Sequence, residues 1–117
     1  MSNRLDNYLK TYRKQAGLSQ KELAYLLGAT DGTKTSRYER FVRIPTLETA
    51  LAYEAALGVP VRELFAGMYQ RAEDRIIRRA KVLKRRLGDQ RPSTSARKLH
   101  KVAALARGTE SESTLAA

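Results

Sequence analysis

The sequence of 117 residues predicts an all-α protein. Apolar residues recur at spacings of three and four along most of the chain, which is the period of helices that bury one face. These stretches stop at Gly17, Gly28 and Gly58, because glycine tolerates the left-handed backbone that closes a helix. One of them starts with Ser19-Gln20-Lys21-Glu22, in which a serine and a glutamate have the spacing of a capping box.

The first two predicted helices lie on either side of the stop and start at Gly17 to Gln20. The first helix covers about three turns and ends before Gly17. Its apolar side consists of Leu5, Tyr8, Leu9, Tyr12 and Ala16. The second helix opens at the Ser19 cap and closes at Gly28. Its buried face consists of Leu23, Ala24 and Leu27.

A third short helix is predicted to follow a turn at Asp31-Gly32. Asp31-Gly32 is a strong turn signal. We therefore expect Thr33 to cap a helix that runs from about Lys34 to Phe41. Two short helices joined by a turn that contains glycine make a helix-turn-helix.

Two further helices complete the predicted N-terminal part. Ile44-Pro45-Thr46 breaks the chain, and Thr46 can cap a helix that ends at Gly58. The apolar residues of that helix are Leu47, Ala50, Leu51, Ala55 and Leu57. Pro60 suits the first turn of a short helix. The residues expected to face inward from it are Val61, Leu64 and Phe65.

Residues 68–87 predict one longer, basic amphipathic helix. Its apolar stripe consists of Tyr69, Ala72, Ile76, Ile77, Ala80, Leu83 and Leu87. Its other face carries Arg75, Arg78, Arg79, Lys81, Arg85 and Arg86. Three interpretations remain open: a helix that pairs with a second copy, a basic arm against DNA, or a sixth helix that docks on its own chain with its basic face in solvent.

The remaining residues predict a linker and a short helix. Residues 88–95 have the composition of a linker, and Ser95 can cap a helix from Ala96 to Arg107. The polar residues 108–113 predict disorder. The expected organisation is a domain over residues 1–67, a basic amphipathic helix over 68–88, and a linker, short helix and disordered tail over 89–117.

The motifs of residues 4 to 67 together resemble a known family. They are Tyr12-Arg13, Gly17-Leu18-Ser19-Gln20, Glu22-Leu23-Ala24, Leu27-Gly28, Ser36, Tyr38-Glu39 and Pro45, followed by Leu57-Gly58-Val59 and Leu64-Phe65. In this order they resemble the lambda-repressor-like helix-turn-helix domains, also called the XRE family. The resemblance implies a five-helix DNA-binding domain in which the third helix is the recognition helix.

The resemblance also implies which residues contact what. The family places an arginine at the position of Arg13 that pairs with the glutamate closing the recognition helix, here Glu39, so a partly buried ion pair is implied. The residues implied at the DNA are Gln20, Thr30, Asp31, Gly32, Thr33, Lys34, Ser36, Arg37, Arg40 and Arg43. An arginine can bond guanine O6 and N7 together and threonine suits either base type, whereas lysine and glutamine suit phosphate.

Three features depart from the family pattern. The interval from Gly28 to Glu39 is one residue longer than usual, Thr35 stands where an apolar residue is usual, and Phe41 stands where glycine is frequent. We expect a longer turn before the recognition helix. We also expect Phe41 to fill an apolar gap beside Tyr38.

The charge of the chain is unevenly distributed. Lys and Arg number 23 against 12 Asp and Glu, a formal net charge of +11. Residues 1–67 carry 10 basic and 7 acidic side chains, a net charge of +3, whereas residues 68–117 carry 13 and 5, a net charge of +8. Such an excess favours a polyanionic partner, which charge alone does not identify as DNA, RNA or an anionic surface.

The composition excludes several classes of protein. There is no cysteine, which excludes disulfides and cysteine-based zinc sites. His100 is the single histidine, so we expect a surface residue, no metal site, no cofactor and no enzyme. No apolar run of about 18 residues and no apolar stretch at the N-terminus occur, so we expect a cytoplasmic protein with no membrane contact.

The function expected from these observations is sequence-specific transcriptional regulation. The simplest mechanism is a repressor that occludes a promoter as a homodimer on palindromic double-stranded DNA. Two alternatives remain open. One is an antitoxin of the same fold, with a toxin protein as a second partner. The other is a non-enzymatic adaptor that holds nucleic acid without sequence preference through its basic tail.

Overall fold

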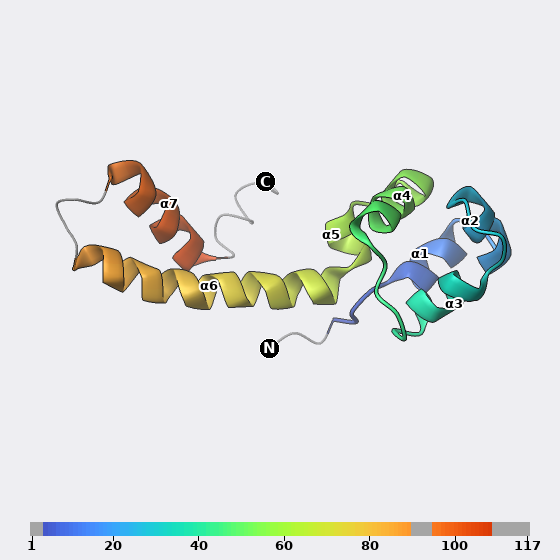
Figure 1. Cartoon of the computed structure of the whole chain (residues 1–117), viewed down its shortest axis with the longest axis horizontal. Coiled ribbons are helices and arrows are strands. Elements are labelled where there is room, and N and C mark those ends of the chain that lie inside the picture. Colours follow the sequence, from blue (N-terminus) through green and yellow to red (C-terminus); the bar gives the residue numbers. More distant parts are fainter. Residues whose placement is uncertain (1–3, 90–94, 109–117) are drawn as a thin grey trace. The chain divides into compact units, whose positions relative to one another are not determined.

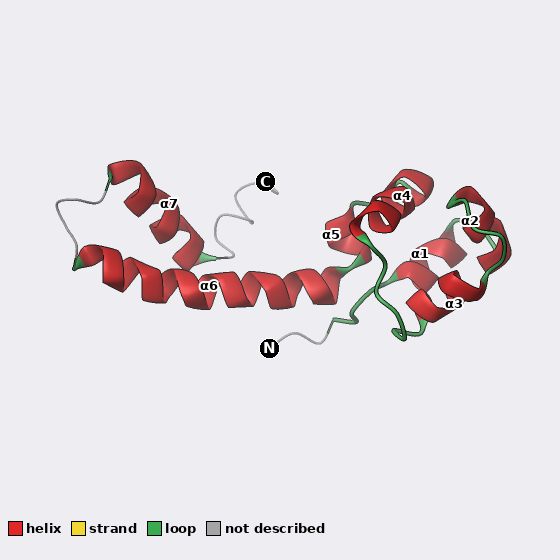
Figure 2. Cartoon of the chain, viewed as in Figure 1, coloured by secondary structure: helices red, strands yellow, loops and turns green. Residues whose placement is uncertain are grey.

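The computed structural model describes residues 4–89 and 95–108, and within these ranges every regular element is an α-helix (Figures 1 and 2). This observation confirms the predicted all-α fold class. The chain divides between Tyr69 and Gln70 into two compact units. We describe each unit by itself.

The first unit contains five short helices and one apolar core. They are α1 (Leu9–Gln15), α2 (Gln20–Leu26), α3 (Thr33–Glu39), α4 (Leu47–Leu57) and α5 (Val61–Leu64). The buried core consists of Leu9, Leu23, Tyr38, Ala50, Tyr53, Leu64 and Phe65. The rings of Tyr38 and Tyr53 meet edge to face, with centroids 6.3 Å apart. This geometry is one that aromatic pairs favour.

The start of α2 and both ends of α4 lie where the sequence predicts them. The hydroxyl of Ser19 accepts the backbone N–H of Glu22 at 3.0 Å, and the Glu22 carboxylate accepts the N–H of Ser19 at 2.8 Å. This capping box confirms the predicted start of α2. Thr46 caps α4, and Gly58 closes it with a left-handed φ of 69°.

The predicted start of the first helix is wrong. Helix α1 begins at Leu9, one turn later than expected, and Leu5 lies outside it. The side chain of Asn7 explains the difference: its Oδ1 accepts the N–H of Leu9 at 3.1 Å, and its Nδ2 donates to the carbonyl of Tyr38 at 2.9 Å. The contact with α3 therefore fixes the segment before α1 in a non-helical conformation.

The expected apolar face of α4 is also partly wrong. Leu47 and Leu51 are 72% and 53% exposed, whereas Tyr53 is fully buried. The period of the helix permits both arrangements. Packing against α3 selects the observed arrangement, because the ring of Tyr53 contacts the ring of Tyr38.

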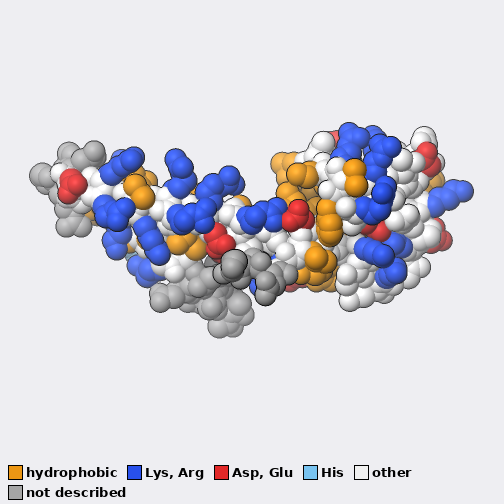
Figure 3. All heavy atoms as spheres, turned by 90° about the horizontal axis from the view of Figure 1, so that it is seen from below, with side chains coloured by type: hydrophobic (Ala, Val, Ile, Leu, Met, Phe, Trp, Pro, Cys, Tyr) orange, Lys and Arg blue, Asp and Glu red, His pale blue; other side chains and the backbone are white. Residues whose placement is uncertain are grey.

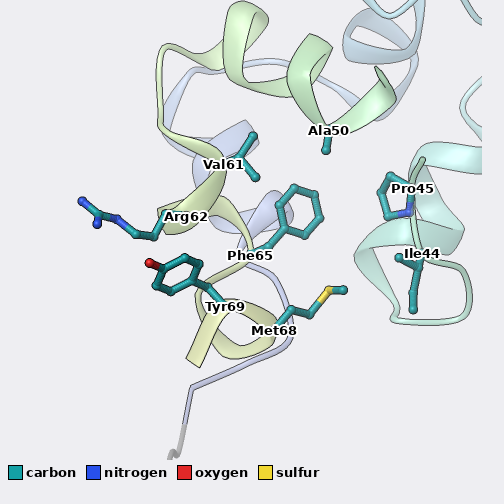
Figure 4. Close-up of a pocket in the computed structure, with 8 residues that line it drawn as sticks. All are labelled: Ile44, Pro45, Ala50, Val61, Arg62, Phe65, Met68 and Tyr69. Carbon is teal, nitrogen blue, oxygen red and sulfur yellow. The ribbon is translucent and has the colours of Figure 1, made fainter. Parts of the chain in front are cut away.

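A hollow with an apolar lining opens on the first unit (Figure 4). Ala50 of α4, Val61 of α5 and Phe65 point into it from one side, while Ile44 and Pro45 approach from the loop before α4. Met68, Tyr69 and Arg62 complete its lining, and the Arg62 guanidinium lies 5.8 Å from the centre of the Tyr69 ring. We call this surface the apolar groove.

The second unit is built from two helices. It contains α6 (Ala66–Gly88) from Gln70 onward and α7 (Ala96–Arg107). Their buried contact consists of Ala80, Leu87 and Val102, supported by Leu99, Leu105 and Ala106. Ser95 caps α7 as predicted, by accepting the N–H of Lys98 at 3.2 Å. The predicted linker and the predicted disordered tail lie almost wholly outside the described residues.

Only part of the predicted stripe on α6 is used in this contact. Ala80 and Leu87 are buried, whereas Ile76 and Leu83 remain 48% and 42% exposed.

Among the described residues, no helix has the length and apolar composition that a membrane-spanning segment needs. The same residues contain no group of three or more His, Asp or Glu side chains placed to hold a metal ion.

Candidate nucleic-acid interface

Helix α3 has a buried side and an exposed side. Thr35, Tyr38 and Glu39 are buried against the unit. Thr33 and Arg37, four residues apart, lie one turn from each other on the exposed side, and Lys34 is exposed beside them. The row continues to Arg40 at the C-cap, because residues three and four apart share a helix face.

The start of α3 differs from the sequence prediction. Thr33 is the first residue of the helix and not its cap, which is Gly32. The carboxylate of Asp31 accepts the N–H of Thr33 at 2.9 Å, and this bond lowers the pKa of Asp31. Asp31 therefore stabilises the turn and keeps a negative charge beside the exposed row. Thr30 is exposed in the same turn.

The end of α3 also lies earlier than predicted, at Glu39 instead of Phe41. The N–H of Val42 donates to the carbonyl of Arg37 at 2.9 Å, and that of Phe41 donates to Tyr38 at 3.1 Å. These two bonds are those of a Schellman motif, in which Phe41 holds the position that glycine usually occupies. Its φ of 64° lies in the left-handed region, and its side chain is 48% exposed. The expectation that Phe41 fills an apolar gap beside Tyr38 is therefore wrong.

A buried ion pair joins α1 to the end of α3. The Nε of Arg13 donates to Oε2 of Glu39 at 2.6 Å, and Nη2 donates to Oε1 at 3.1 Å. A third bond runs from Nη1 of Arg13 to the carbonyl of Leu18 at 2.8 Å. The bond with Glu39 raises the pKa of Arg13, so the guanidinium stays charged. The pair fixes the orientation of α3 in the unit.

Gln20 takes part in the same network. Its Nε2 donates to Oε1 of Glu39 at 3.0 Å, and the side chain is half-buried. The structure thus places Gln20 on the inner side of α3 rather than in the exposed row. One amide proton and the amide oxygen of Gln20 are not part of this bond.

The remaining residues predicted at the interface lie around the exposed row. Ser36 is half-buried, and its hydroxyl accepts the Nε of Arg40 at 3.2 Å. This bond holds the Arg40 side chain along α3. Arg43 is exposed in the loop after the helix, where its N–H lies 3.3 Å from the carbonyl of Arg37. Gly32 faces the start of α2: a Cβ placed there would lie 3.5 Å from the backbone of Gln20.

The arrangement offers a short helix whose outward side chains can donate hydrogen bonds. Arg37 has a planar guanidinium that matches the O6 and N7 acceptors of guanine, a contact worth about 1–3 kcal/mol of discrimination between bases. Thr33 presents a hydroxyl and a methyl group one turn away. Lys34, Arg40 and Arg43 place three cations around these two residues, which suits phosphate contacts.

Sequence reasoning missed Asn7 and Tyr53, which both support the site. Asn7 bonds to α3 through the carbonyl of Tyr38, and the signal for it was an asparagine two positions before α1, a residue type that accepts backbone N–H groups near helix starts. The side chains of Thr35 and Tyr53 are buried on the inner side of α3. The Thr35 hydroxyl influences the pKa of Tyr53, although no hydrogen bond of standard geometry joins the Tyr53 hydroxyl to any described residue.

The comparisons with known proteins identify the first unit. The family model described as helix-turn-helix matches residues 9–64. Neither the comparison with curated proteins nor the comparison with solved structures found a match. Residues 9–64, which contain α1 to α5, therefore form a lambda-repressor-like helix-turn-helix domain of the XRE family, and this membership supports a general role in DNA binding and regulation.

Proposed function

We propose that the chain is a sequence-specific, non-enzymatic transcriptional regulator that acts in the cytoplasm. Helix α3 is its recognition helix, and residues 1–67 are its DNA-binding domain. The observation that carries the proposal is the exposed row Thr33–Arg37–Arg40 on a helix whose inner side is fixed by the buried Arg13–Glu39 pair. A fixed helix presents its side chains to base edges with little loss of conformational freedom.

Each residue of the row has a distinct role in this proposal. Arg37 reads a guanine in the major groove, and Thr33 contacts the neighbouring base pair. Lys34, Arg40 and Arg43 neutralise phosphates and set the position of α3 on the duplex. Asp31 repels phosphate, so in this arrangement its only contact with DNA is to accept a hydrogen bond from the amino group of a cytosine.

The proposed repressor is a homodimer. One helix of seven residues makes few base contacts, so two copies on a palindromic site are needed for selective binding. The apolar groove is the proposed contact between copies. The exposed side chain of Ile44 forms part of its lining, and in a two-fold interface this residue of each copy can enter the groove of the other.

Selection of duplexes from random DNA tests the proposed function. The expected result is a palindromic consensus bound about a thousandfold more tightly than scrambled DNA. Arg37→Ala should remove that preference, whereas Lys14→Ala, which removes the same charge from the exposed side of α1, should keep it. Failure to select any consensus would contradict a sequence-specific regulator and would favour an adaptor that holds nucleic acid by charge.

Sedimentation analysis tests the dimer. The wild-type chain should sediment as a dimer and Ile44→Asp as a monomer, because a carboxylate cannot be buried in the groove without a partner. Leu26→Asp, on an exposed leucine outside the groove, is the control and should leave the dimer intact. A monomeric wild type that instead binds a second protein through the groove would favour the antitoxin alternative. Repression itself is tested with a reporter downstream of the selected site.

A further inference from the structure

One side of α6 carries a dense run of cations. From Arg75 to Gly88 the helix has no acidic residue. The exposed cations of this stretch are Arg75, Arg78, Arg79, Lys81, Lys84, Arg85 and Arg86. At 100° per residue, four of them, Arg75, Arg78, Arg79 and Arg86, fall within about 100° of the helix circumference. We call these four residues the arginine arc. Figure 3, which views α6 from the side away from α7, shows Lys and Arg side chains along the helix.

The charges of this stretch oppose the formation of the helix. Arg75 and Arg79 are four residues apart, as are Lys81 and Arg85, and each like-charged pair at this spacing costs a few tenths of a kcal/mol. The described part of α7 likewise has no acidic residue, and its Arg97, Lys98 and Lys101 are exposed. The second unit therefore maintains a cationic surface against its own repulsion. A polyanion removes that repulsion when it binds.

The apolar side of α6 is only partly available for a membrane. It faces α7, where Ala80 and Leu87 are buried with Val102. A basic amphipathic helix binds a bilayer by inserting its apolar side. Here Ala80 and Leu87 of that side are covered within the unit, whereas Ile76 is 48% exposed. Val82 and Leu83 remain partly exposed between Arg78, Arg79 and Arg86, around a hollow of the surface. The surface that remains is chiefly cationic.

We infer that the arginine arc is a second, sequence-independent DNA-binding surface that contacts the phosphates of the duplex read by α3. The inference rests on the proposed function, which supplies DNA as the polyanion. Once α3 is docked, the arc is held at a high effective concentration near the same duplex, so even a weak phosphate contact adds to the affinity. Specificity resides in the first unit, and the arc contributes binding strength without discrimination between sequences.

Salt dependence of binding tests this inference on the full chain. The variant is Arg75→Gln with Arg79→Gln, and its matched control is Lys10→Gln with Lys14→Gln. Both replace an exposed pair of cations four residues apart on one helix, and glutamine keeps the helix propensity high. Affinity for a selected duplex and a scrambled duplex is measured by fluorescence anisotropy between 50 and roughly 200 mM salt, a range in which phosphate contacts change affinity strongly.

We expect the affinity of the arc variant for DNA to depend less steeply on salt concentration. Each lost phosphate contact lowers the magnitude of the slope of log K against log salt by about 0.9, so the arc variant should lose up to about 1.8 on both duplexes. The control should lose much less, and the ratio between the duplexes should stay unchanged in both. Extending the variant to Arg78→Gln and Arg86→Gln should deepen the loss. Because these changes relieve repulsion, the thermal midpoint should not fall.

Two results would overturn the inference. One is that the double and the quadruple arc variants both show the same salt dependence of DNA binding as the control variant. The other is an unchanged slope on DNA with weakened binding of an RNA duplex, which would assign the arc to RNA. Failure of the proposed function gives another result. The wild-type chain would then bind the selected and the scrambled duplex equally, while the arc substitutions would still lower the salt dependence of binding.

Discussion

Phe41 is the one non-glycine residue with a positive φ in the described part of the chain. A side chain in this region brings Cβ close to the following carbonyl and costs about 1–2 kcal/mol. The two backbone bonds that end α3 hold Phe41 there, so the cost is offset by the satisfied carbonyls of Arg37 and Tyr38. The direction in which the chain leaves the recognition helix depends on this residue.

Comparison of Phe41→Gly with Phe41→Ala isolates the strain, because both variants lose the aromatic ring. At an ordinary helical position alanine is the more stable of the two, by about 0.5–1 kcal/mol. At Phe41 we expect the opposite order, with glycine more stable by about 1 kcal/mol. Urea unfolding of both variants measures the difference. Equal stability, or a more stable alanine variant, would show that the residue is not strained.

Tyr53 gives the domain a pH dependence in the alkaline range. Burial raises the pKa of Tyr53 to about 12, against a smaller lowering by the Thr35 hydroxyl. The folded protein thus keeps a proton that the unfolded chain releases near pH 10, the ordinary value. Above that pH the unfolded state binds fewer protons, so the free energy of unfolding falls as the pH rises.

Tyr53→Phe tests this assignment. The difference in unfolding free energy between the wild type and the variant should be constant below about pH 10 and should then shift in favour of the variant. At neutral pH the variant should be as stable as the wild type or slightly more so, since it removes a buried hydroxyl that lacks a well-formed hydrogen bond. Parallel pH profiles of the two proteins would contradict the assignment.

At the scale of the elements, the position of α3 depends on polar anchors. Arg13 of α1 and Gln20 of α2 both bond to Glu39, and Asn7 bonds to the carbonyl of Tyr38. A buried pair of this kind adds little net stability over an apolar one, but removal of one partner leaves the other charge unpaired. The network therefore defines where the recognition helix lies.

Glu39→Gln should destabilise the protein by about 3 kcal/mol, because the buried guanidinium of Arg13 loses its counter-charge. Chemical denaturation measures the loss. Glu22→Gln is the control and should change stability little, since glutamine can also accept the N–H of Ser19 in the capping box. A cost for Glu39→Gln no larger than that of the control would show that the pair is not what fixes α3.

The two glycines of α6 should respond in opposite ways to alanine. A Cβ at Gly67 would lie 2.6 Å from the carbonyl carbon of Leu5 and closer still to its oxygen, whereas a Cβ at Gly88 has no atom within 4 Å. Gly67→Ala should therefore cost about 1–3 kcal/mol. Gly88→Ala should add about 0.5–1 kcal/mol, since it lies in a helix with open surroundings. Thermal unfolding of both variants checks the contrast.

The helix starts that a serine or threonine side chain caps were predictable, because the bond that sets each of them is local. Ser19, Thr46 and Ser95 cap helices through bonds to residues three positions away, and all three caps were predicted. The start of α1 depends on a bond from Asn7 to a residue 31 positions later, which the apolar period of the sequence does not contain. The burial of Tyr53 in place of Leu47 has the same cause.

The candidate site could also be predicted only in part from the sequence. The pairing of Arg13 with Glu39 followed from the family resemblance, and the two residues are in contact in the structure. The bond from Gln20 to the same carboxylate was not foreseen, because a polar residue at a helix start is also suited to phosphate. Which side chains meet DNA stays a prediction, since burial shows only that Thr33 and Arg37 face outward.

For the whole molecule, charge and recognition are assigned to different parts of the chain. Residues 1–67 have a net charge of +3 and contain the recognition helix, whereas residues 68–117 have a net charge of +8. Under our proposals, substitutions in α3 change which sequence is bound, and substitutions in α6 change how strongly any duplex is bound. The two kinds of variant should therefore combine additively in binding free energy.

The most direct test of the central claim, that α3 reads DNA through Arg37, is a double-substitution cycle between protein and DNA. Each guanine of the selected consensus is replaced in turn by 7-deazaguanine, which lacks the N7 acceptor, and affinities are measured for the wild type and for Arg37→Ala. We expect one guanine whose replacement weakens the wild type severalfold to tenfold and leaves the variant unchanged. If every replacement affects both proteins equally, Arg37 reads no guanine, and the assignment of α3 as the recognition helix loses its main support.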